Sequence, residues 1–587
     1  MFVQALAEYA DNYLSKELGD EAWEDKPVPY FIELAPDGTF LNVTNHNVAT
    51  VRGKKTFSSP AELRVPKSPV TRVAGLHPLL AVDYIKYVVG AGPWTAKGKE
   101  TNNQERHDAF VALIGRAAQE TNDDALRACA RFFERPDQVD LARSALGAAK
   151  TDSMIALSVN GPVVKRPSVR EYWGRHYREA AGEQVAKRGD AECLISGRVG
   201  PIARTHEKIK GLKKLGGQSA GVSLMSFDKD AFCSYGWEQN ANSPVSPDRA
   251  MAYVLALNDL LRIDKGHRRD IAGVGFIFWT KERSDFDPMS NVDQPDPAQI
   301  DRLLRFDPTA DPDPNMFYMA GVAGNGGRML IRYWVAETLG TVKANLRDWF
   351  AGLRVADVYT GKPAEPPKLW QLLRAIDRKG EPPADRVIAV LRRALEGQAQ
   401  PFGYRMLSAA LTRLRAETHR RLDPVRLGLI RLCLNDLISP KGESLMSESL
   451  DSGQRHPAYL SGRLLAVYES LQYAVNRGVN QTVTDRYYSL ASTNPALAFP
   501  KLEDLGQKHL RKLRRENPGA RVRIEQEIGK LHVEIEQACG FRFPALLDLE
   551  AQGRFALGYH HQRAHQMTQA QKAKANQLEA GQKEENQ

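Results

Sequence analysis

The chain has 587 residues, of which 42% are hydrophobic and 26% charged, which suits several folded cores and excludes a largely disordered protein. Its 81 Lys and Arg residues outnumber 71 Asp and Glu residues, giving a formal charge of +10 that favours an anionic partner only where the basic residues cluster. Five scattered cysteines without a CxxC pair argue against a disulfide framework and a zinc finger.

The N-terminal sequence, MFVQALAEYADNYL, lacks the basic start and apolar core of a signal peptide. No run of 18 apolar residues occurs elsewhere in the chain. We therefore expect a cytoplasmic protein that does not span a membrane.

Residues 27–89 are rich in strand patterns. The segments VPYFIEL and FLNV flank Pro36-Asp37-Gly38, which predicts a hairpin, and VATVRGKKTF predicts a second one. A helical pattern follows over residues 113–133. The first region is therefore expected to mix strands and helices.

The middle of the chain continues this mixture. MAYVLALNDLLR predicts a helix, IAGVGFIFWT a buried strand, residues 326–335 another strand, and VKANLRDWFAGL a helix. Residues 281–315 contain eight Asp and six Pro. Clustered carboxylates can bind a divalent metal, but Asp-Pro units are typical of turns and no D-x-D-x-D-G loop occurs, so we predict a loop.

From residue 367 onward helical patterns predominate, and Ile524, Ile528, Leu531, Ile535 and Ala538 share one helix face. We predict an α+β protein: a mixed α/β region over residues 1–366 and a C-terminal α-helical bundle over 367–566. The polar residues 567–587 are expected to be disordered beyond a helical stub.

The segment from Cys193 to Ser246 carries the most distinctive pattern. Basic residues precede a glycine-rich run, namely Arg204, His206, Lys208, Lys210, Lys213 and Lys214, followed by Gly216, Gly217, Gln218 and Ser219. Gly211 and Gly216 are spaced as in a P-loop, but Gly217 and Gln218 stand where Lys and Ser or Thr are required. The composition suits a nucleic-acid backbone, with lysines and glycine amides on phosphates. The alternative is a solvated basic loop with a glycine hinge.

Two other polar patches favour nucleic acid in the same way. One contains Asn45, Lys54 and Lys55, and the other contains Asn102 and Asn103. Amide and ammonium groups at loop tips read groove edges and phosphates. Exposed turns use the same residue types for backbone reasons, so each patch has both interpretations.

Catalytic and metal-binding motifs are weak by comparison. His107-Asp108 is an isolated HD pair, and His560, His561 and His565 lie near no Cys or carboxylate partner and are expected to be solvated. We find no nucleophile triad, zinc-protease helix or paired-carboxylate motif. We therefore expect a protein that is not an enzyme and that needs no metal or cofactor.

Residues 193–261 carry an ordered set of uncommon motifs: C-L-x-S-G, P-I-A-R-x-H-x-K-I-K-G, G-G-Q-S-A-G-x-S-L-x-S-F, A-F-x-S-Y-G-x-E-Q and N-x-P-V-S, then A-x-x-Y-x-x-A-L-N-x-L-L. This order resembles the large subunit of the type I-C CRISPR Cascade complex. Weaker likeness extends over Y-F-I-E-L, V-D-Y-I-K-Y-V-V-G and the helical C-terminal third, and so over nearly the whole chain.

The resemblance implies a non-catalytic subunit of a guide-RNA surveillance complex. Such subunits recognise the protospacer-adjacent motif (PAM) in double-stranded DNA, help to open the duplex and stabilise the displaced strand in the R-loop. Its partners would be guide RNA, target DNA, the Cascade backbone and cap subunits, and a helicase-nuclease. Guide pairing supplies most sequence specificity in such systems, a division known for another effector class.

The family also implies a small subunit translated from an internal start in the same gene. Met446, in the polar segment SPKGESLMSESLDSGQ, precedes the last helices and suits such a start. An ordinary surface methionine is the alternative. For the whole chain, the competing functions are a metal-dependent enzyme that processes nucleic acid and a basic scaffold that binds only protein.

Overall fold

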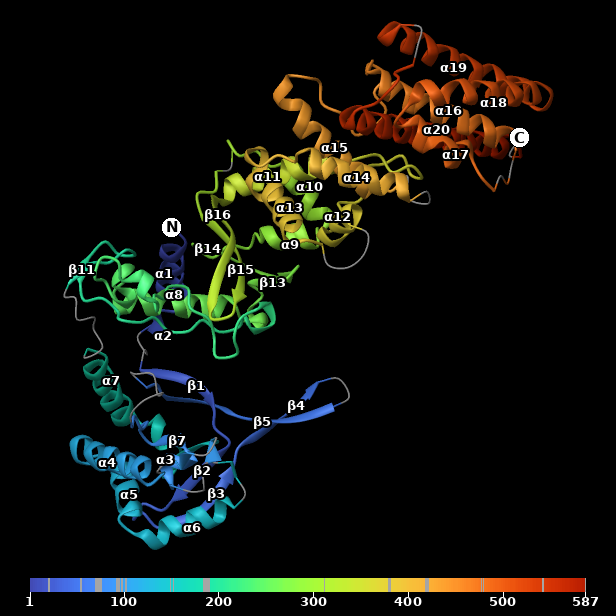
Figure 1. The fold of residues 1–587 in the computed structure, drawn as a ribbon. Helices are drawn as coiled ribbons and strands as arrows, with labels where there is room; N and C mark the ends of the chain where they lie inside the picture. Colours follow the sequence, from blue (N-terminus) through green and yellow to red (C-terminus); the bar gives the residue numbers. More distant parts are fainter. Residues whose placement is uncertain are drawn as a thin grey trace. The chain divides into compact units, whose positions relative to one another are not determined.

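A computed structural model describes residues 1–18, 22–52, 55–68, 76–90, 95–96, 99–100, 103–147, 149–150, 152–182, 190–310, 312–377, 382–417, 422–476, 478, 480–540 and 543–585. The chain forms two compact units (Figure 1). Unit 1 comprises Met1–Lys210 and Ala220–Asp259, and unit 2 comprises Gly211–Ser219 and Leu260–Gln587. The predicted α+β class is confirmed.

The core of unit 1 contains a four-stranded sheet of order β3-β2-β10-β7. Its strands are β2 (Tyr30–Leu34), β3 (Phe40–Asn45), β7 (Val82–Tyr84) and β10 (Met154–Ser158). β10 pairs on both edges, parallel to β2 and antiparallel to β7, and its side chains are buried along its whole length in the core of the unit. The predicted hairpin between β2 and β3 is confirmed.

The turn of that hairpin is fixed by local chemistry. The carboxylate of Asp37 accepts hydrogen bonds from the backbone N–H and the hydroxyl of Thr39, both at 2.9 Å. Gly38 has φ +88°, and a Cβ atom there would lie 2.6 Å from the carbonyl oxygen of Ala128. The turn therefore requires glycine both for its conformation and for close packing on a helix.

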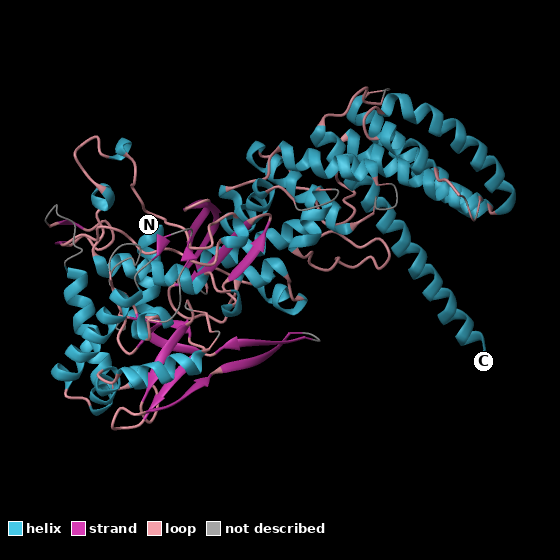
Figure 2. Cartoon of the chain, turned by 60° about the horizontal axis from the view of Figure 1, so that its bottom comes forward, coloured by secondary structure: helices cyan, strands magenta, loops and turns pink. Residues whose placement is uncertain are grey.

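The helices of unit 1 are α1 (Phe2–Tyr13), α2 (Ser15–Leu18), α3 (Ile85–Val88), α4 (Asn103–Thr121), α5 (Asp124–Phe133), α6 (Pro136–Leu146), α7 (Pro167–Gly182) and α8 (Pro247–Leu260). Of these, α3 to α7 share a hydrophobic core with the sheet. The paired strands are β1 (Trp23–Pro27) with β6 (Glu62–Pro66), β4 (Asn47–Arg52) with β5 (Lys55–Pro60), β8 (Thr95–Ala96) with β9 (Lys99–Glu100), and β11 (Ala191–Glu192) with β12 (Val199–Gly200). The β4–β5 pair confirms the second predicted hairpin and forms a ribbon that projects from unit 1 (Figure 2).

The helical pattern predicted over residues 113–133 is confirmed, but it spans two helices, α4 and α5. Asn122 adopts a left-handed conformation with φ +53°, which ends α4. The carboxylate of Asp123 then caps α5 by accepting hydrogen bonds from Ala125 and Leu126 N–H. A residue that can adopt positive φ, followed by a strong N-cap residue, therefore divides the apolar pattern between two helices.

Unit 2 contains a four-stranded antiparallel sheet in which the strands lie side by side in chain order. Its strands are β13 (Arg268–Ile271), β14 (Val274–Thr280), β15 (Met316–Asn325) and β16 (Arg328–Thr338). The predicted helix at α8, the strands at β14 and β16, and the helix at α11 (Leu339–Leu353) are confirmed.

The segment 281–315 is not wholly a loop as predicted, because α9 (Pro288–Asp293) and α10 (Pro297–Leu304) lie within it. Asp287 caps α9 by accepting from two backbone N–H groups, and Asp296 caps α10 in the same way with one. Each Asp is followed by a proline at the first helical position. The Asp-Pro pairs that suggested turns therefore begin helices here, since aspartate satisfies N–H groups and proline lacks one.

All named elements after residue 366 are helical among the described residues, although this transition lies within unit 2 and does not separate the two units. The α-helices are α12 (Leu369–Ile376), α13 (Ala384–Glu396), α14 (Tyr404–Ala416), α15 (Pro424–Ile438), α16 (Pro457–Val475), α17 (Val483–Ala491), α18 (Pro495–Glu516), α19 (Pro518–Cys539) and α20 (Leu549–Glu585). Residues 567–585 belong to α20, so the helix extends well beyond the stub expected in this polar tail. Within the described residues, no helix has both the length and the hydrophobicity required to cross a bilayer.

Helix α20 packs tightly on α16 in the C-terminal bundle. A Cβ atom at Gly462 would lie 2.1 Å from Phe555 O, and one at Gly558 would lie 2.1 Å from Tyr459 O, so the two backbones are in contact. His560 and His561 are fully buried in this packing. The expectation that these histidines are solvated is therefore wrong.

Candidate nucleic-acid interface

The glycine-rich run lies against the β15–β16 hairpin of unit 2. A 3₁₀ turn, η2 (Lys213–Leu215), ends at Gly216, which has φ +89°. The N–H group of Gln218 donates to Gly326 O at 3.0 Å, and the N–H group of Gly326 donates to Gly216 O at 3.1 Å. The loop is thus held on the hairpin by backbone hydrogen bonds.

The glycines on both sides allow this close approach. A Cβ atom at Gly216 would lie 2.5 Å from Gly324 O, and one at Gly324 would lie 2.3 Å from the backbone nitrogen of Gly217. The N–H group of Gly217 donates to Leu212 O at 3.0 Å. The N–H group of Gly217 is therefore already satisfied within unit 2, contrary to the expectation that glycine amides contact phosphate, and the N–H group of Gln218 is satisfied as well.

The same contacts fix the position of two lysines. Lys213 and Lys214 are exposed on η2, whereas the next residue, Leu215, is buried. A Cβ atom at Gly275 would lie 2.7 Å from Leu215 Cδ1, so Leu215 packs directly on β14. The turn therefore presents two ammonium groups to solvent from an anchored backbone. Gln218 and Ser219 are also exposed in this loop.

The other predicted basic residues belong to unit 1. Ile209 pairs with Val222 through hydrogen bonds in both directions, at 2.7 and 2.8 Å, and this short bridge leaves Lys208 and Lys210 exposed. The ammonium group of Lys208 donates to Ser223 Oγ at 2.8 Å. Arg204 is exposed and donates through Nε to Gln239 Oε1 at 2.7 Å. These three cations can still face an anion with their remaining N–H groups.

His206 differs from the neighbouring basic residues. Its Nδ1 atom lies 2.7 Å from the hydroxyl oxygen of Tyr253, a buried residue of α8. Burial lowers the pKa of His206 to about 4, so the imidazole is neutral at physiological pH. The expectation that His206 adds positive charge for phosphate is therefore wrong, and the residue instead joins the loop to α8.

The structure places the residues of the two smaller polar patches in different environments. Asn45 is exposed at the end of β3, as a contact residue requires. Lys54 and Asn102 lie outside the described residues, and Lys55 begins β5 without a described side chain. Asn103 does not lie at a loop tip: it starts α4, is buried, and accepts a hydrogen bond from Arg106 at 3.0 Å.

Sequence reasoning missed the partner of the glycine-rich run. Gly324, Gly326 and Gly327 lie in the segment AGNGG, which connects β15 to β16. The signal was a glycine cluster directly after an apolar strand, which marks a close approach of backbones. Its partner, about 110 residues earlier in the chain, could not be identified from the sequence.

The isolated HD pair makes structural contacts in the described part of the chain. Among the residues that the structure describes, no three His, Cys, Asp or Glu side chains are arranged to hold a metal ion. His107 Nδ1 lies 3.3 Å from Tyr87 O, and burial lowers the pKa of His107. Asp108 accepts a hydrogen bond from Gln104 at 2.8 Å. The contacts of the HD pair are thus structural.

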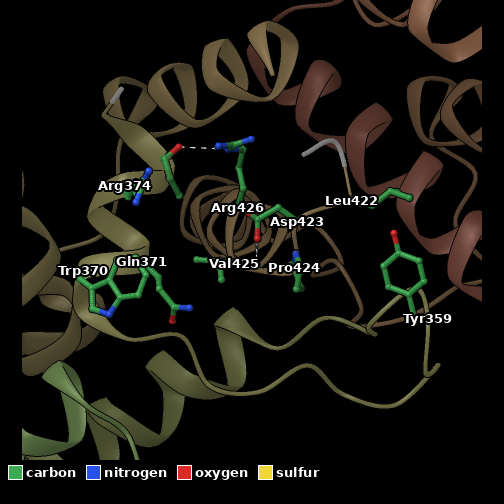
Figure 3. A pocket seen from close by; sticks show the side chains of 10 residues that line it. Tyr359, Trp370, Gln371, Arg374, Leu422, Asp423, Pro424, Val425 and Arg426 are labelled. Atoms are coloured by element: carbon green, nitrogen blue, oxygen red, sulfur yellow. Dashed lines mark hydrogen bonds between the residues drawn. The ribbon is translucent and has the colours of Figure 1, made fainter. Parts of the chain in front are cut away.

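A cavity of about 420 Å³ opens beside α12 and the start of α15 (Figure 3). Trp370 and Tyr359 lie at opposite ends of this cavity. Arg426 donates to Ala375 O at 3.3 Å, and Asp423 caps α15 by accepting from Val425 N–H at 3.1 Å. These polar groups hold helices together, so we assign no reaction to the cavity.

Comparison with protein families matched residues 6–567 to the CRISPR-associated protein (Cas_Csd1) family. The chain belongs to this family. A search of curated proteins found no match. Because the family match spans nearly the whole chain, it confirms a CRISPR-associated protein, and membership implies work in a CRISPR complex with nucleic acid and other Cas proteins.

Proposed function

We propose that this Cas_Csd1 chain is the non-catalytic large subunit of a type I-C guide-RNA surveillance complex. In this role it recognises the PAM in double-stranded DNA, assists duplex opening, stabilises the R-loop and helps to recruit a helicase-nuclease. Within the family, the anchored Lys213-Lys214 turn carries the proposal. Two exposed ammonium groups on a fixed backbone can hold a duplex phosphate backbone in one register, which positions nearby side chains for base contacts.

The first test measures duplex binding by the RNA-loaded complex, assembled with and without this chain. The targets are matched duplexes that differ only in the flanking motif. We expect binding that depends on both the chain and the motif. Binding that is indifferent to both would contradict the proposed recognition role.

A charge-reversal variant tests the lysine turn itself. Lys213→Glu with Lys214→Glu should weaken duplex binding and flatten the slope of log K against log salt by about 1.8, because each phosphate contact contributes about 0.9. Arg283→Glu with Arg302→Glu changes the same charge at exposed positions of unit 2 and serves as control. If the two variants weakened binding equally, the loss of positive charge anywhere on unit 2 would explain the effect, and the lysine turn would have no specific role.

The metal-dependent enzyme is the competing function. It predicts that the purified chain cleaves DNA or RNA when Mg²⁺ or Mn²⁺ is added and stops when a chelator is added. We propose that the chain instead remains inert toward nucleic acid under both conditions. The proposal would be overturned if a nuclease activity copurified with the wild-type chain and was abolished by substituting carboxylate residues of the chain.

An internally started small subunit remains part of the proposal. Met446 precedes α16, so a product that begins there would contain α16 to α20, and α16 contacts each of the other four helices. In the full chain Met446 is buried, and its N–H group donates to Asn435 Oδ1 at 2.8 Å, so it is not an ordinary surface methionine. Replacing its codon with a non-start codon should abolish the short product, and persistence of that product would exclude this start.

A further inference from the structure

Arg332 occupies the irregular point of the β15–β16 pairing. Gly321 pairs with Tyr333 and Val322 pairs with Ile331, so Arg332 has no opposite residue. Such a β-bulge turns the extra side chain out of the regular alternation, and bulges are frequent beside functional sites. Arg332 is exposed, and among the residues that the structure describes it forms no ion pair.

This bulge borders a groove of about 440 Å³ in unit 2, within the usual range of ligand pockets. Strand β16, helix α13 and the start of α14 supply its walls. Four arginines line it, and they are Arg332, Arg386, Arg392 and Arg405. Asp385 is the carboxylate that lines the groove with them.

The arginines retain hydrogen-bonding capacity for an anion. Arg392 lies over the ring of Tyr333, 5.5 Å from its centroid, and its side chain is 42% exposed. Its Nε is 3.8 Å from Glu396 Oε1, beyond hydrogen-bond range. Arg405 has a side chain 94% exposed and lies 3.8 Å from Asp385.

One arginine is already engaged. Arg386 pairs with the carboxylate of Asp377 and donates to Ile376 O at 3.4 Å. It is therefore held in place by its own partners. The guanidinium groups best placed to accept a new anionic partner are those of Arg332, Arg392 and Arg405.

Apolar residues form the rest of the groove surface. Ile388, Pro401, Phe402 and Met406 line it, with Phe402 and Met406 buried. A small inorganic anion would gain nothing from this apolar surface. An unpaired nucleotide would bury the flat face of its base there while the backbone phosphates meet the guanidinium groups.

We infer that this arginine groove binds a single-stranded polynucleotide, with phosphates on Arg332, Arg392 and Arg405 and a base against the apolar floor. The inference rests on the proposed function in nucleic-acid recognition and adds a site that is separate from the Lys213-Lys214 turn in its residues. A duplex cannot use the floor, because its bases are stacked and paired.

The test uses the full chain and fluorescent oligonucleotides of equal length, namely oligo-dT, oligo-U and a DNA duplex. Arg332→Gln with Arg405→Gln removes two exposed charges and should leave folding intact. We expect about tenfold weaker binding of oligo-dT or oligo-U. The log K against log salt slope should flatten by about 1.4, since each phosphate contact of a single strand contributes about 0.7. Arg283→Gln with Arg302→Gln is the matched control and should change neither quantity.

A larger loss of affinity for oligo-dT would identify displaced DNA as the bound strand, and a larger loss for oligo-U would identify guide RNA. Either result supports binding of a single strand in the groove. Equal binding by the groove variant and the control would overturn the inference. Competition by polyglutamate as effective as by an oligonucleotide of equal charge would also overturn it and would assign the groove to an acidic protein segment. Motif-dependent duplex binding by the complex is a separate measurement, so the proposed function and this inference can fail independently.

Discussion

Gly216 offers a direct test of how the basic loop is mounted. Ala at this position must adopt a left-handed conformation, which costs about 1–2 kcal/mol. Its Cβ atom would also meet Gly324 O at 2.5 Å, and such overpacking typically costs about 1–3 kcal/mol more. Gly216→Ala should therefore destabilise the docked loop by about 2–5 kcal/mol.

Gly266 provides a matched control because it also ends a 3₁₀ turn in the left-handed region, with φ +80° and open space around its Cβ position. Gly266→Ala should cost only the conformational part, so the two variants should differ by about 1–3 kcal/mol.

Hydrogen exchange measures this difference locally, at the N–H groups of Gln218 and Gly326 that hold the loop. Peptides that contain these residues should exchange about 5 to 150 times faster in Gly216→Ala than in Gly266→Ala. Equal exchange in the two variants would refute the argument that backbone contact fixes the loop. It would also remove the structural reason for treating Lys213 and Lys214 as a fixed pair.

Three further substitutions test the packing of unit 2 by urea unfolding. Asp436→Ala removes both 2.8 Å hydrogen bonds to the buried guanidinium of Arg393 and should cost about 3–5 kcal/mol, and a loss below about 1 kcal/mol would contradict this. Gly462→Ala should destabilise the α16–α20 contact by about 1–3 kcal/mol, whereas Gly529→Ala, with open space at its Cβ position, should be neutral or stabilising. Burial lowers the pKa of His560 from 6.5 to about 4, so the unfolded chain binds this proton first as the pH falls. This difference should lower the free energy of unfolding of the wild-type chain by about 2 kcal/mol between pH 7 and 5, and His560→Gln should lack this contribution. Equal pH dependence of the wild-type chain and the variant would contradict the argument.

Local chemistry made some elements predictable and misled at others. Pro36-Asp37-Gly38 predicts its hairpin correctly because a turn is determined by its own residues. Asp287 and Asp296 begin helices where the sequence predicts a loop, because an aspartate before proline is equally suited to a turn and to the start of a helix. The choice depended on whether the next residues could bury an apolar face against α11, which is a tertiary contact.

The candidate site shows the same limit. Lys213 and Lys214 are exposed, as their charge predicts. The neutral state of His206, in contrast, follows from its burial beside Tyr253, which lies 47 residues later in the chain. Asn103 likewise looked like a loop-tip residue and is buried at the start of α4. Residue type alone could not distinguish a ligand-facing polar group from one satisfied inside the protein.

The sequence by itself determined the α+β class, the order of most elements and, through its ordered motifs, the CRISPR-associated family, since these depend on local periodicity and on residues adjacent in the chain. Only the tertiary structure decided that the glycine-rich run docks on the β15–β16 turn, that α20 continues to Glu585, and that Arg332 lines a groove with three arginines from α13 and α14. Each of these features depends on contacts between distant segments, whose pairing is set by packing and close backbone approach and leaves no periodic signal in the sequence.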